Sequence, residues 1–207
     1  MKRIAVLVSG GGTNLQALID AQSRGELGGG QIVAVISSKA GAYALERAKN
    51  AGIEGFVLPR KEFDSNRSMT VALVELLRKL HIDLVVLAGC MTIFTEELIE
   101  AYPNAIMNVH PALIPSFCGK GYYGLRVHEE ALKYGVKVSG ATVHFVTEEC
   151  DGGPIIAQEP VAVLPGDTPE MLQRRIMEQG EWIALPRAVA LFCQDRIKVE
   201  GRTVIIQ

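Results

Sequence analysis

Short apolar segments alternate with segments of helical periodicity through the first half of the chain, and this alternation constrains the fold more than any other feature. We expect strands at residues 4–8, 32–36, 55–58 and 84–88, and helices after residue 14 and at residues 43–51 and 67–80. Residues 84–88 (LVVLA) contain no polar side chain, which is typical of strands covered by helices on both faces. The pattern predicts an α/β fold with a mostly parallel sheet.

The second half of the chain has a different pattern. Residues 141–146 alternate in polarity, and residues 155–163 form another extended run after the turn sequence DGGP at 151–154. These segments predict antiparallel strands in a mixed sheet, covered by a helix at about residues 169–193 and followed by a hairpin at 197–206. Because no linker or repeat interrupts the chain, we expect one compact unit of 207 residues with two lobes.

The charge and the cysteines disfavour several classes of protein. A formal net charge of −2 and the absence of a Lys/Arg run argue against nucleic acid and membrane surfaces as partners. No apolar stretch reaches the ~18 residues of a membrane span, and the apolar run near Met1 is too short for a signal peptide, so we expect a cytoplasmic protein. The four cysteines lack the spacing of a zinc site or a disulfide framework.

A glycine turn, residues 9–14 (SGGGTN), connects the first strand to the first helix. Backbone N–H groups at a helix N-terminus attract phosphate, and Thr13 and Asn14 add side-chain donors. A nicotinamide dinucleotide is disfavoured, because Leu15 replaces the last glycine of that fingerprint, and no Gly-Lys-Ser/Thr of a Walker A motif follows. The segment is either a phosphate site or only a tight strand-to-helix connection.

Asn108 and His110 follow a predicted strand at residues 105–107, which Pro111 would end because it has no N–H. Side chains two residues apart in a strand share one face, about 6–7 Å apart. The pair would then face a pocket at the carboxyl edge of the sheet, where open α/β folds bind ligands. An amide that stabilises an oxyanion and an imidazole that moves a proton suit acyl transfer; the alternative is a strand end that only meets solvent.

Other polar residues carry weaker signals. Asp151 opens a sequence typical of turns, but near His110 its carboxylate would raise the pKa of the imidazole. His144 could line the same pocket or pair with the backbone, whereas His81 and His128 are expected to be solvated or locally hydrogen-bonded. The segment at residues 91–94 is expected to be part of the core or to form an apolar wall for a flat heterocycle; it contains Met91, Thr92, Ile93 and Phe94.

Several segments occur in order and at compatible spacing along the chain: residues 9–14 (SGGGTN), 87–91 (LAGCM), 108–111 (NVHP), 113–117 (LIPSF), 142–146 (TVHFV) and 151–154 (DGGP). Together they resemble the phosphoribosylglycinamide formyltransferase family over nearly the whole chain. The resemblance implies a Rossmann-like formyltransferase fold in a single domain, 1–207, with a phosphate-binding lobe at 1–100 and a folate and catalytic lobe at 101–207. It also implies transfer of the formyl group of 10-formyltetrahydrofolate to the amine of 5-phosphoribosylglycinamide in purine synthesis.

The resemblance also implies roles for individual residues. His110 would transfer the proton, Asn108 would stabilise the tetrahedral oxyanion, and Asp151 would pair with His110. The residues implied for the ribotide and its phosphate are Gly12, Thr13, Asn14 and Glu181. Those implied for the folate are Arg67, Met91, Thr92, Ile93, Phe94, Asn108, His144 and Asp151. The folate would be a cosubstrate, and no metal is expected.

Some positions depart from the pattern of the family. Thr13 replaces a serine, Ser38 an asparagine and Trp182 a histidine, while Arg67 is shifted by one residue. The loop after Ser116 is lengthened by residues 118–123 (CGKGYY). The three residues implied in catalysis are unchanged.

Three alternatives share part of the pattern. A 10-formyltetrahydrofolate hydrolase would release formate to water, but carries a further N-terminal regulatory domain. Methionyl-tRNA formyltransferase needs a C-terminal tRNA-binding domain, and a non-catalytic folate or nucleotide binder could use the same fold. With the ribotide and the reduced folate as its ligands, we expect the protein to be a monomer or a homodimer.

Overall fold

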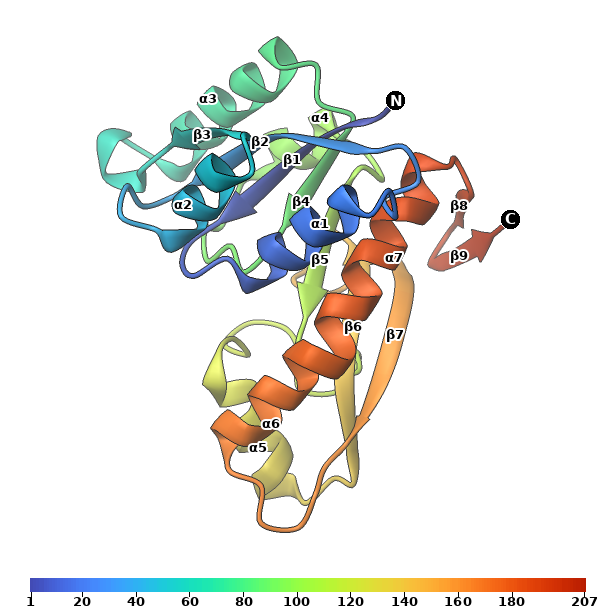
Figure 1. The fold of residues 1–207 in the computed structure, drawn as a ribbon. Helices are drawn as coiled ribbons and strands as arrows, with labels where there is room; N and C mark the ends of the chain where they lie inside the picture. The colour runs from blue at the N-terminus through green and yellow to red at the C-terminus, as the bar shows by residue number, and fades with distance from the viewer.

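The structure, a computed structural model, describes residues 1–207 and has a seven-stranded sheet at its centre. The strands are β1 (Arg3–Val8), β2 (Gln31–Ser37), β3 (Glu54–Val57), β4 (Leu84–Leu87), β5 (Ile106–His110), β6 (Val138–Phe145) and β7 (Ile155–Ala162). Their order is β3-β2-β1-β4-β5-β6-β7 (Figure 1). Strands β1 to β5 pair in parallel and β6 and β7 antiparallel, so the predicted mixed sheet is confirmed.

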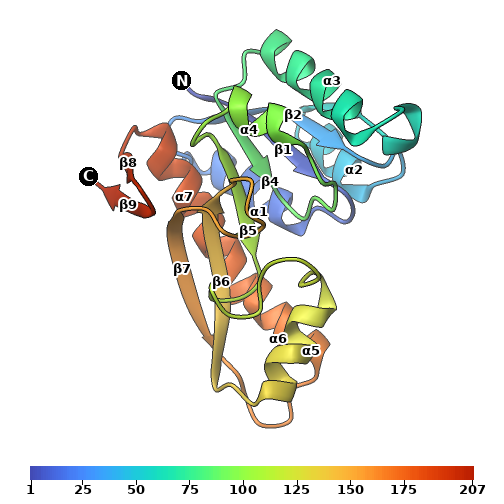
Figure 2. The same cartoon turned by 180° about the vertical axis from the view of Figure 1, so that it is seen from behind.

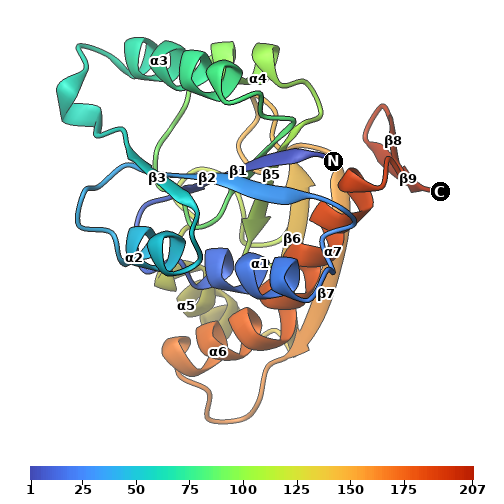
Figure 3. The same ribbon diagram turned by 45° about the horizontal axis from the view of Figure 1, so that its top comes forward.

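Helices cover both faces of the parallel part of the sheet, as expected from its apolar strands. The helices are α1 (Thr13–Ser23), α2 (Tyr43–Asn50), α3 (Asn66–Lys79), α4 (Glu96–Ala101), α5 (Leu125–Tyr134), α6 (Pro169–Ile176) and α7 (Trp182–Cys193), with a short 3-10 helix, η1 (Arg60–Glu62). Helices α3 and α4 lie on one side of the sheet and α1, α2 and α7 on the other (Figure 3). The two main clusters of buried side chains fill these two layers.

Strands β6 and β7 extend past the other strands, and α5 and α6 lie beside this extension (Figure 2). A small cluster of buried residues joins the four elements, including Ala131, Val161 and Leu172. None of the helices combines the length and the apolar composition that crossing a bilayer would require. The predicted C-terminal hairpin is confirmed as β8 (Ile197–Glu200) and β9 (Thr203–Ile206), which form a sheet of their own.

Most predicted boundaries agree with the structure to within one or two residues, but β6 begins at Val138 rather than at residue 141, and two further boundaries differ. Strand β5 does not end at residue 107 but continues to His110, because Asn108 and His110 pair with His144 and Thr142 of β6. The helix expected at residues 169–193 is interrupted by a π-helical turn, η2 (Met177–Glu181), between α6 and α7. Both differences lie beside the candidate active site.

Candidate active site

The carboxyl ends of β1, β4 and β5 meet at one edge of the sheet, since these strands are parallel neighbours. Between β1 and β4 the strand order reverses, which is where open α/β sheets bind ligands. Ser9, at the end of β1, ties the loops together: its hydroxyl oxygen accepts hydrogen bonds from the Met91 N–H at 2.9 Å and from the Ser38 hydroxyl at 3.0 Å. The glycine turn and the segment after β4 are therefore direct neighbours.

The glycine turn is shaped by a close approach of its backbone to α2. Gly12 has φ 71, and a Cβ atom added there would lie 2.6 Å from the Cβ of Ala44. Only glycine satisfies both conditions without strain. Because Gly12 precedes the first residue of α1, the exposed turn leads directly into a helix N-terminus, where backbone N–H groups are available to an anion.

Glu181 lies beside this turn, although it is far away in the sequence. Its Oε2 accepts a hydrogen bond of 2.9 Å from Asn14 Nδ2, and both residues are buried. The π-helical turn ends at Glu181, and such turns often occur at functional sites. Burial raises the pKa of the Glu181 carboxyl, which the Asn14 hydrogen bond partly opposes. The structure thus brings together Gly12, Thr13, Asn14 and Glu181, the predicted ribotide residues.

The second group of polar residues lies on one face of β5 and β6. Asn108 is directly opposite His144, and His110 is directly opposite Thr142. The shared face expected for Asn108 and His110 is therefore present, and β6 adds two further polar side chains to it. Asn108 Nδ2 lies 3.3 Å from His144 Nε2, within hydrogen-bond distance.

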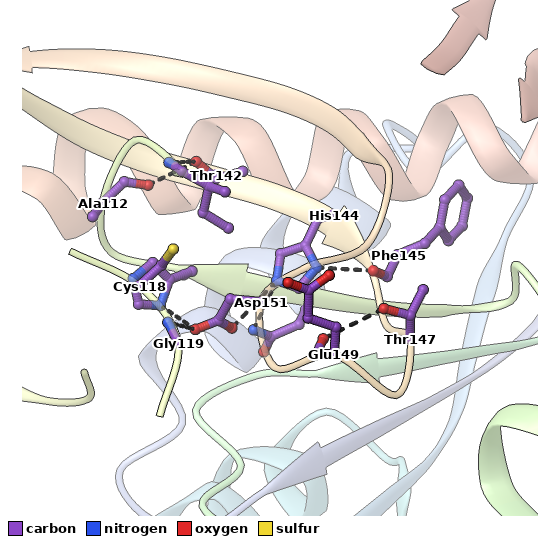
Figure 4. Close-up of polar contacts among 12 residues, drawn as sticks. Ala112, Cys118, Gly119, Thr142, His144, Phe145, Thr147, Glu149 and Asp151 are labelled. Carbon is purple, nitrogen blue, oxygen red and sulfur yellow. Dashed lines mark hydrogen bonds and ion pairs between the residues drawn. The ribbon is translucent and has the colours of Figure 1, made fainter. Parts of the chain in front are cut away.

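Asp151 lies between the two histidines. Its Oδ2 is 3.6 Å from His110 Nδ1, and its Oδ1 is 3.6 Å from His144 Nε2. The Gly119 N–H donates a hydrogen bond of 2.8 Å to Oδ2, so the loop after β5 also holds the carboxylate (Figure 4). The structure brings together all three predicted catalytic residues, together with His144.

The turn that carries Asp151 has a backbone that few sequences can adopt. Asp151 has φ 55, in the left-handed region that aspartate tolerates better than most residues. A Cβ atom on Gly153 would lie 1.8 Å from the Phe145 carbonyl oxygen, and the Phe145 N–H donates to Pro154 O at 2.9 Å. The sequence DGGP therefore fixes Asp151 against the end of β6.

Hydrogen bonds to backbone carbonyls determine which nitrogen of each histidine carries a proton. His110 Nε2 lies 2.8 Å from Phe117 O and His144 Nδ1 lies 2.9 Å from Phe145 O, and a carbonyl oxygen can only accept. His110 Nδ1 is then the basic nitrogen, and it faces Asp151. In neutral His144, Nε2 accepts from Asn108 Nδ2, which leaves the second Nδ2 hydrogen of Asn108 free for a substrate oxygen.

The two titrating groups have pKa values suited to proton transfer. Burial lowers the pKa of His110, against the opposing influence of Asp151 and of the Phe117 carbonyl. Burial alone would raise the pKa of Asp151, but the polar contact with His144, the Gly119 hydrogen bond and the charge that each histidine carries when protonated outweigh it and lower this pKa. At neutral pH a neutral imidazole therefore faces an ionised carboxylate. Asp151 raises the pKa of His110 as expected, but burial has the larger effect.

The predicted folate residues form a less compact group. Met91 and Ile93 are exposed, whereas Thr92 and Phe94 line a small apolar pocket with residues of α3. Arg67 is exposed and forms an ion pair with Glu97 of α4. Exposed apolar side chains beside the strand ends leave a surface that a flat ring could cover.

Sequence patterns did not indicate several residues that build the site. The Thr142 hydroxyl donates to Ala112 O at 2.7 Å and accepts from Ile114 N–H at 3.1 Å, which holds the loop after His110.

The expectation for His128 was wrong: its ring is buried and has no hydrogen-bond partner, and burial lowers its pKa to about 4. The reason is that α5 turns His128 inward with Val127 and Ala131. His81 is exposed as expected.

The four cysteines do not form a metal site. All four are free thiols, and no three or more His, Cys, Asp or Glu side chains are placed to hold a metal ion. Cys118 and Cys150 are the sequence neighbours of Gly119 and Asp151, and burial raises the pKa of both thiols.

Comparisons with known proteins agree with this geometry. The sequence profile of the formyl transferase family matches residues 2–189. The phosphoribosylglycinamide formyltransferase of Haemophilus influenzae is 42% identical over 200 residues, which cover 97% of this chain and 91% of that protein. The crystal structure of glycinamide ribonucleotide transformylase 1 from Symbiobacterium toebii is 45% identical, with a TM-score of 0.94 over 100% of this chain and 94% of that chain.

A more distant neighbour has the same fold. A formyltetrahydrofolate deformylase from Pseudomonas syringae pv. tomato is 28% identical, with a TM-score of 0.88, and the match covers 99% of this chain but 65% of that chain. The profile match and the full-length relatives decide the family. This chain belongs to the formyl transferase family and, within it, to the phosphoribosylglycinamide formyltransferases.

Proposed function

We propose that the protein transfers the formyl group of 10-formyltetrahydrofolate to the amine of 5-phosphoribosylglycinamide in purine synthesis. The observation that carries this proposal is the position of the cluster of Asn108, His110, His144 and Asp151. It lies at the same sheet edge as a glycine turn that faces a helix N-terminus. An acyl-transfer centre beside a phosphate site suits a phosphorylated amine acceptor.

The glycine turn and Glu181 hold the acceptor in this proposal. The phosphate accepts hydrogen bonds from the N–H groups at the start of α1 and from the Thr13 hydroxyl. Glu181 and Asn14 face the ribose hydroxyls, which can donate to the carboxylate and to the amide oxygen. Asn14 Oδ1 is buried and has no partner within the chain, so a rearrangement of this pair on binding would satisfy it.

The reduced folate lies against residues 91–94 and the loop 148–151 in this proposal, with Arg67 near its outer end. Residues 1–100 then supply the phosphate turn and residues 101–207 the catalytic groups. The two lobes are not fully separate in function. Glu181, from the second lobe, reaches the phosphate turn, and residues 91–94, from the first lobe, contact the folate. Both substrates are small and soluble, which fits a cytoplasmic protein that acts as a monomer or homodimer without a metal.

In the chemical step, the amine nitrogen of the acceptor attacks the formyl carbon, and the carbonyl π electrons move to the oxygen. Asn108 donates its free Nδ2 hydrogen to this oxyanion. The amine proton passes to His110 Nδ1, where Asp151 stabilises the imidazolium. The oxyanion then re-forms the carbonyl, the bond from the formyl carbon to N10 of the folate breaks, and N10 receives the proton from His110.

The proposal is tested by following the folate product with and without the ribotide. Turnover that requires 5-phosphoribosylglycinamide supports the transferase. Equal turnover without it would instead make the protein a hydrolase, and no turnover under either condition would indicate a non-catalytic binder.

Asp151→Asn tests the electrostatic part of the site. The carboxylate raises the pKa of His110, so its removal shifts that pKa further below its usual range. Neutral His110 is the active base and activity is lost as pH falls through its pKa, so the acid limb of the kcat profile moves to lower pH. Because Asp151 no longer stabilises the imidazolium, kcat also falls. NMR titration of the four histidines measures the shift directly, and His128 is set apart by its pKa of about 4.

An unchanged or raised His110 pKa in Asp151→Asn would contradict this account. Asn keeps an oxygen that can accept from the Gly119 N–H, so the loop contact is preserved and the charge alone changes.

A further inference from the structure

Helix α2 holds the glycine turn from outside, although no sequence motif links the two. The Ala44 N–H donates to Gly10 O at 3.1 Å, and Arg47 Nε donates to Gly11 O at 2.8 Å. The side chain of Ala44 also blocks any Cβ atom on Gly12. Every glycine of the turn is therefore in contact with α2.

These contacts determine where the N–H groups of the turn point. In a trans peptide, the C=O of one residue and the N–H of the next point in opposite directions. Because the carbonyls of Gly10 and Gly11 point toward α2, the N–H groups of Gly11 and Gly12 point away from it. Neither N–H has a hydrogen-bond partner within the chain. Both are available to an anion on the far side of the turn.

Arg47 is itself held in place by two further contacts. Its Nη1 donates to Gln16 Oε1 of α1 at 2.9 Å, and its guanidinium lies 4.9 Å from the centre of the Tyr43 ring. The side chain thus joins α2, the turn and α1. Its acceptors are neutral oxygens, so its positive charge remains available to raise the potential beside the turn.

We propose that Arg47 is a positioning residue for phosphate binding, which fixes the Gly11 carbonyl and so directs the N–H groups of the turn at the phosphate. This inference rests on the proposed function, because it takes the acceptor to be phosphorylated. It assigns Arg47 a part in distinguishing 5-phosphoribosylglycinamide from the same acceptor without its phosphate. Arg47 acts through the backbone of the turn and need not touch the phosphate.

The test compares Arg47→Met, Arg47→Lys and, as a matched control, Arg24→Met, since Arg24 pairs only with Glu26 on the exposed surface. Loss of one charged hydrogen bond predicts that Arg47→Met raises KM for the ribotide about 10- to 100-fold. The inhibition constant of inorganic phosphate rises with it. Arg47→Lys keeps a charged donor, so its two constants should lie between those of wild type and Arg47→Met. The control Arg24→Met should keep the wild-type values. KM for 10-formyltetrahydrofolate and kcat/KM for the unphosphorylated glycinamide riboside stay at wild-type values in all variants.

Unchanged ribotide KM and phosphate inhibition in Arg47→Met would overturn the inference. A parallel loss with the unphosphorylated acceptor or the folate would also overturn it, because a merely structural role predicts such a loss. Should Arg47→Met fail to fold, Arg47→Lys carries the same comparison. If wild type used both acceptors equally, the proposed acceptor would be wrong, and inhibition by inorganic phosphate alone would then decide the role of Arg47.

Discussion

His110→Ala is expected to lower kcat about 1,000-fold, within the range that a positioned general base contributes. The variant loses the imidazole whose Nδ1 faces Asp151 and whose Nε2 is already bonded to the Phe117 carbonyl. Without it, the proton of the attacking amine has no acceptor, while the glycine turn and residues 91–94 are untouched. Steady-state kinetics with both substrates saturating measure the loss, and calorimetry shows whether each substrate still binds.

His81→Ala serves as the matched control for this variant, since His81 is exposed at the corner after α3 and should leave kcat unchanged. Wild-type turnover in His110→Ala would refute the assigned role. Loss of substrate binding together with turnover would show instead that the residue holds the loop through Phe117.

Asn108→Ala is expected to lower kcat by about 100- to 1,000-fold, the cost of removing one oxyanion donor. The amide is oriented by His144, whose own ring is fixed by the Phe145 carbonyl. Its free hydrogen therefore requires little reorganisation when the charge develops on the formyl oxygen. Since this charge exists only after attack, KM should change much less than kcat.

Asn108→Asp sharpens the test, because a carboxylate of the same shape places negative charge where the oxyanion forms. It should be less active than Asn108→Ala, whereas Asn50→Ala, at the exposed end of α2, should match wild type. If the aspartate variant retained more activity than the alanine variant, Asn108 would not be the oxyanion donor.

Much of the fold could be predicted because its signals are local. The apolar run at residues 84–88 identifies a strand buried on both faces, and it forms β4. The alternation of strands and helices indicates the parallel half. The shared face of Asn108 and His110 follows from the two-residue period of a strand, but the strand continues to His110 instead of ending at the predicted residue 107. Pairing with β6 extends β5 to His110, and no property of residues 105–110 alone specifies that pairing.

The assembly of the site depends on contacts between distant segments. Asp151 reaches His110 because the antiparallel register of β5 and β6 and the left-handed turn at Asp151 combine. Glu181 is the last residue of a π-helical turn and contacts Asn14. Such a turn changes the direction of side chains relative to a regular helix. The burial of His128 differs from the prediction because the buried face of α5 depends on its packing against β6 and α6. The periodicity of a helix alone therefore does not indicate where the side chains of Glu181 and His128 lie.

The central claim is that the formyl carbon moves from the folate to the amine of a phosphorylated acceptor. The most direct measurement follows 10-formyltetrahydrofolate labelled with carbon-13 in its formyl group, by NMR in the presence of the enzyme and 5-phosphoribosylglycinamide. The account predicts that the label leaves the folate and appears as a formamide carbon attached to the ribotide, at the rate of enzyme turnover. Label that accumulates as free formate, with the ribotide unchanged, would contradict it.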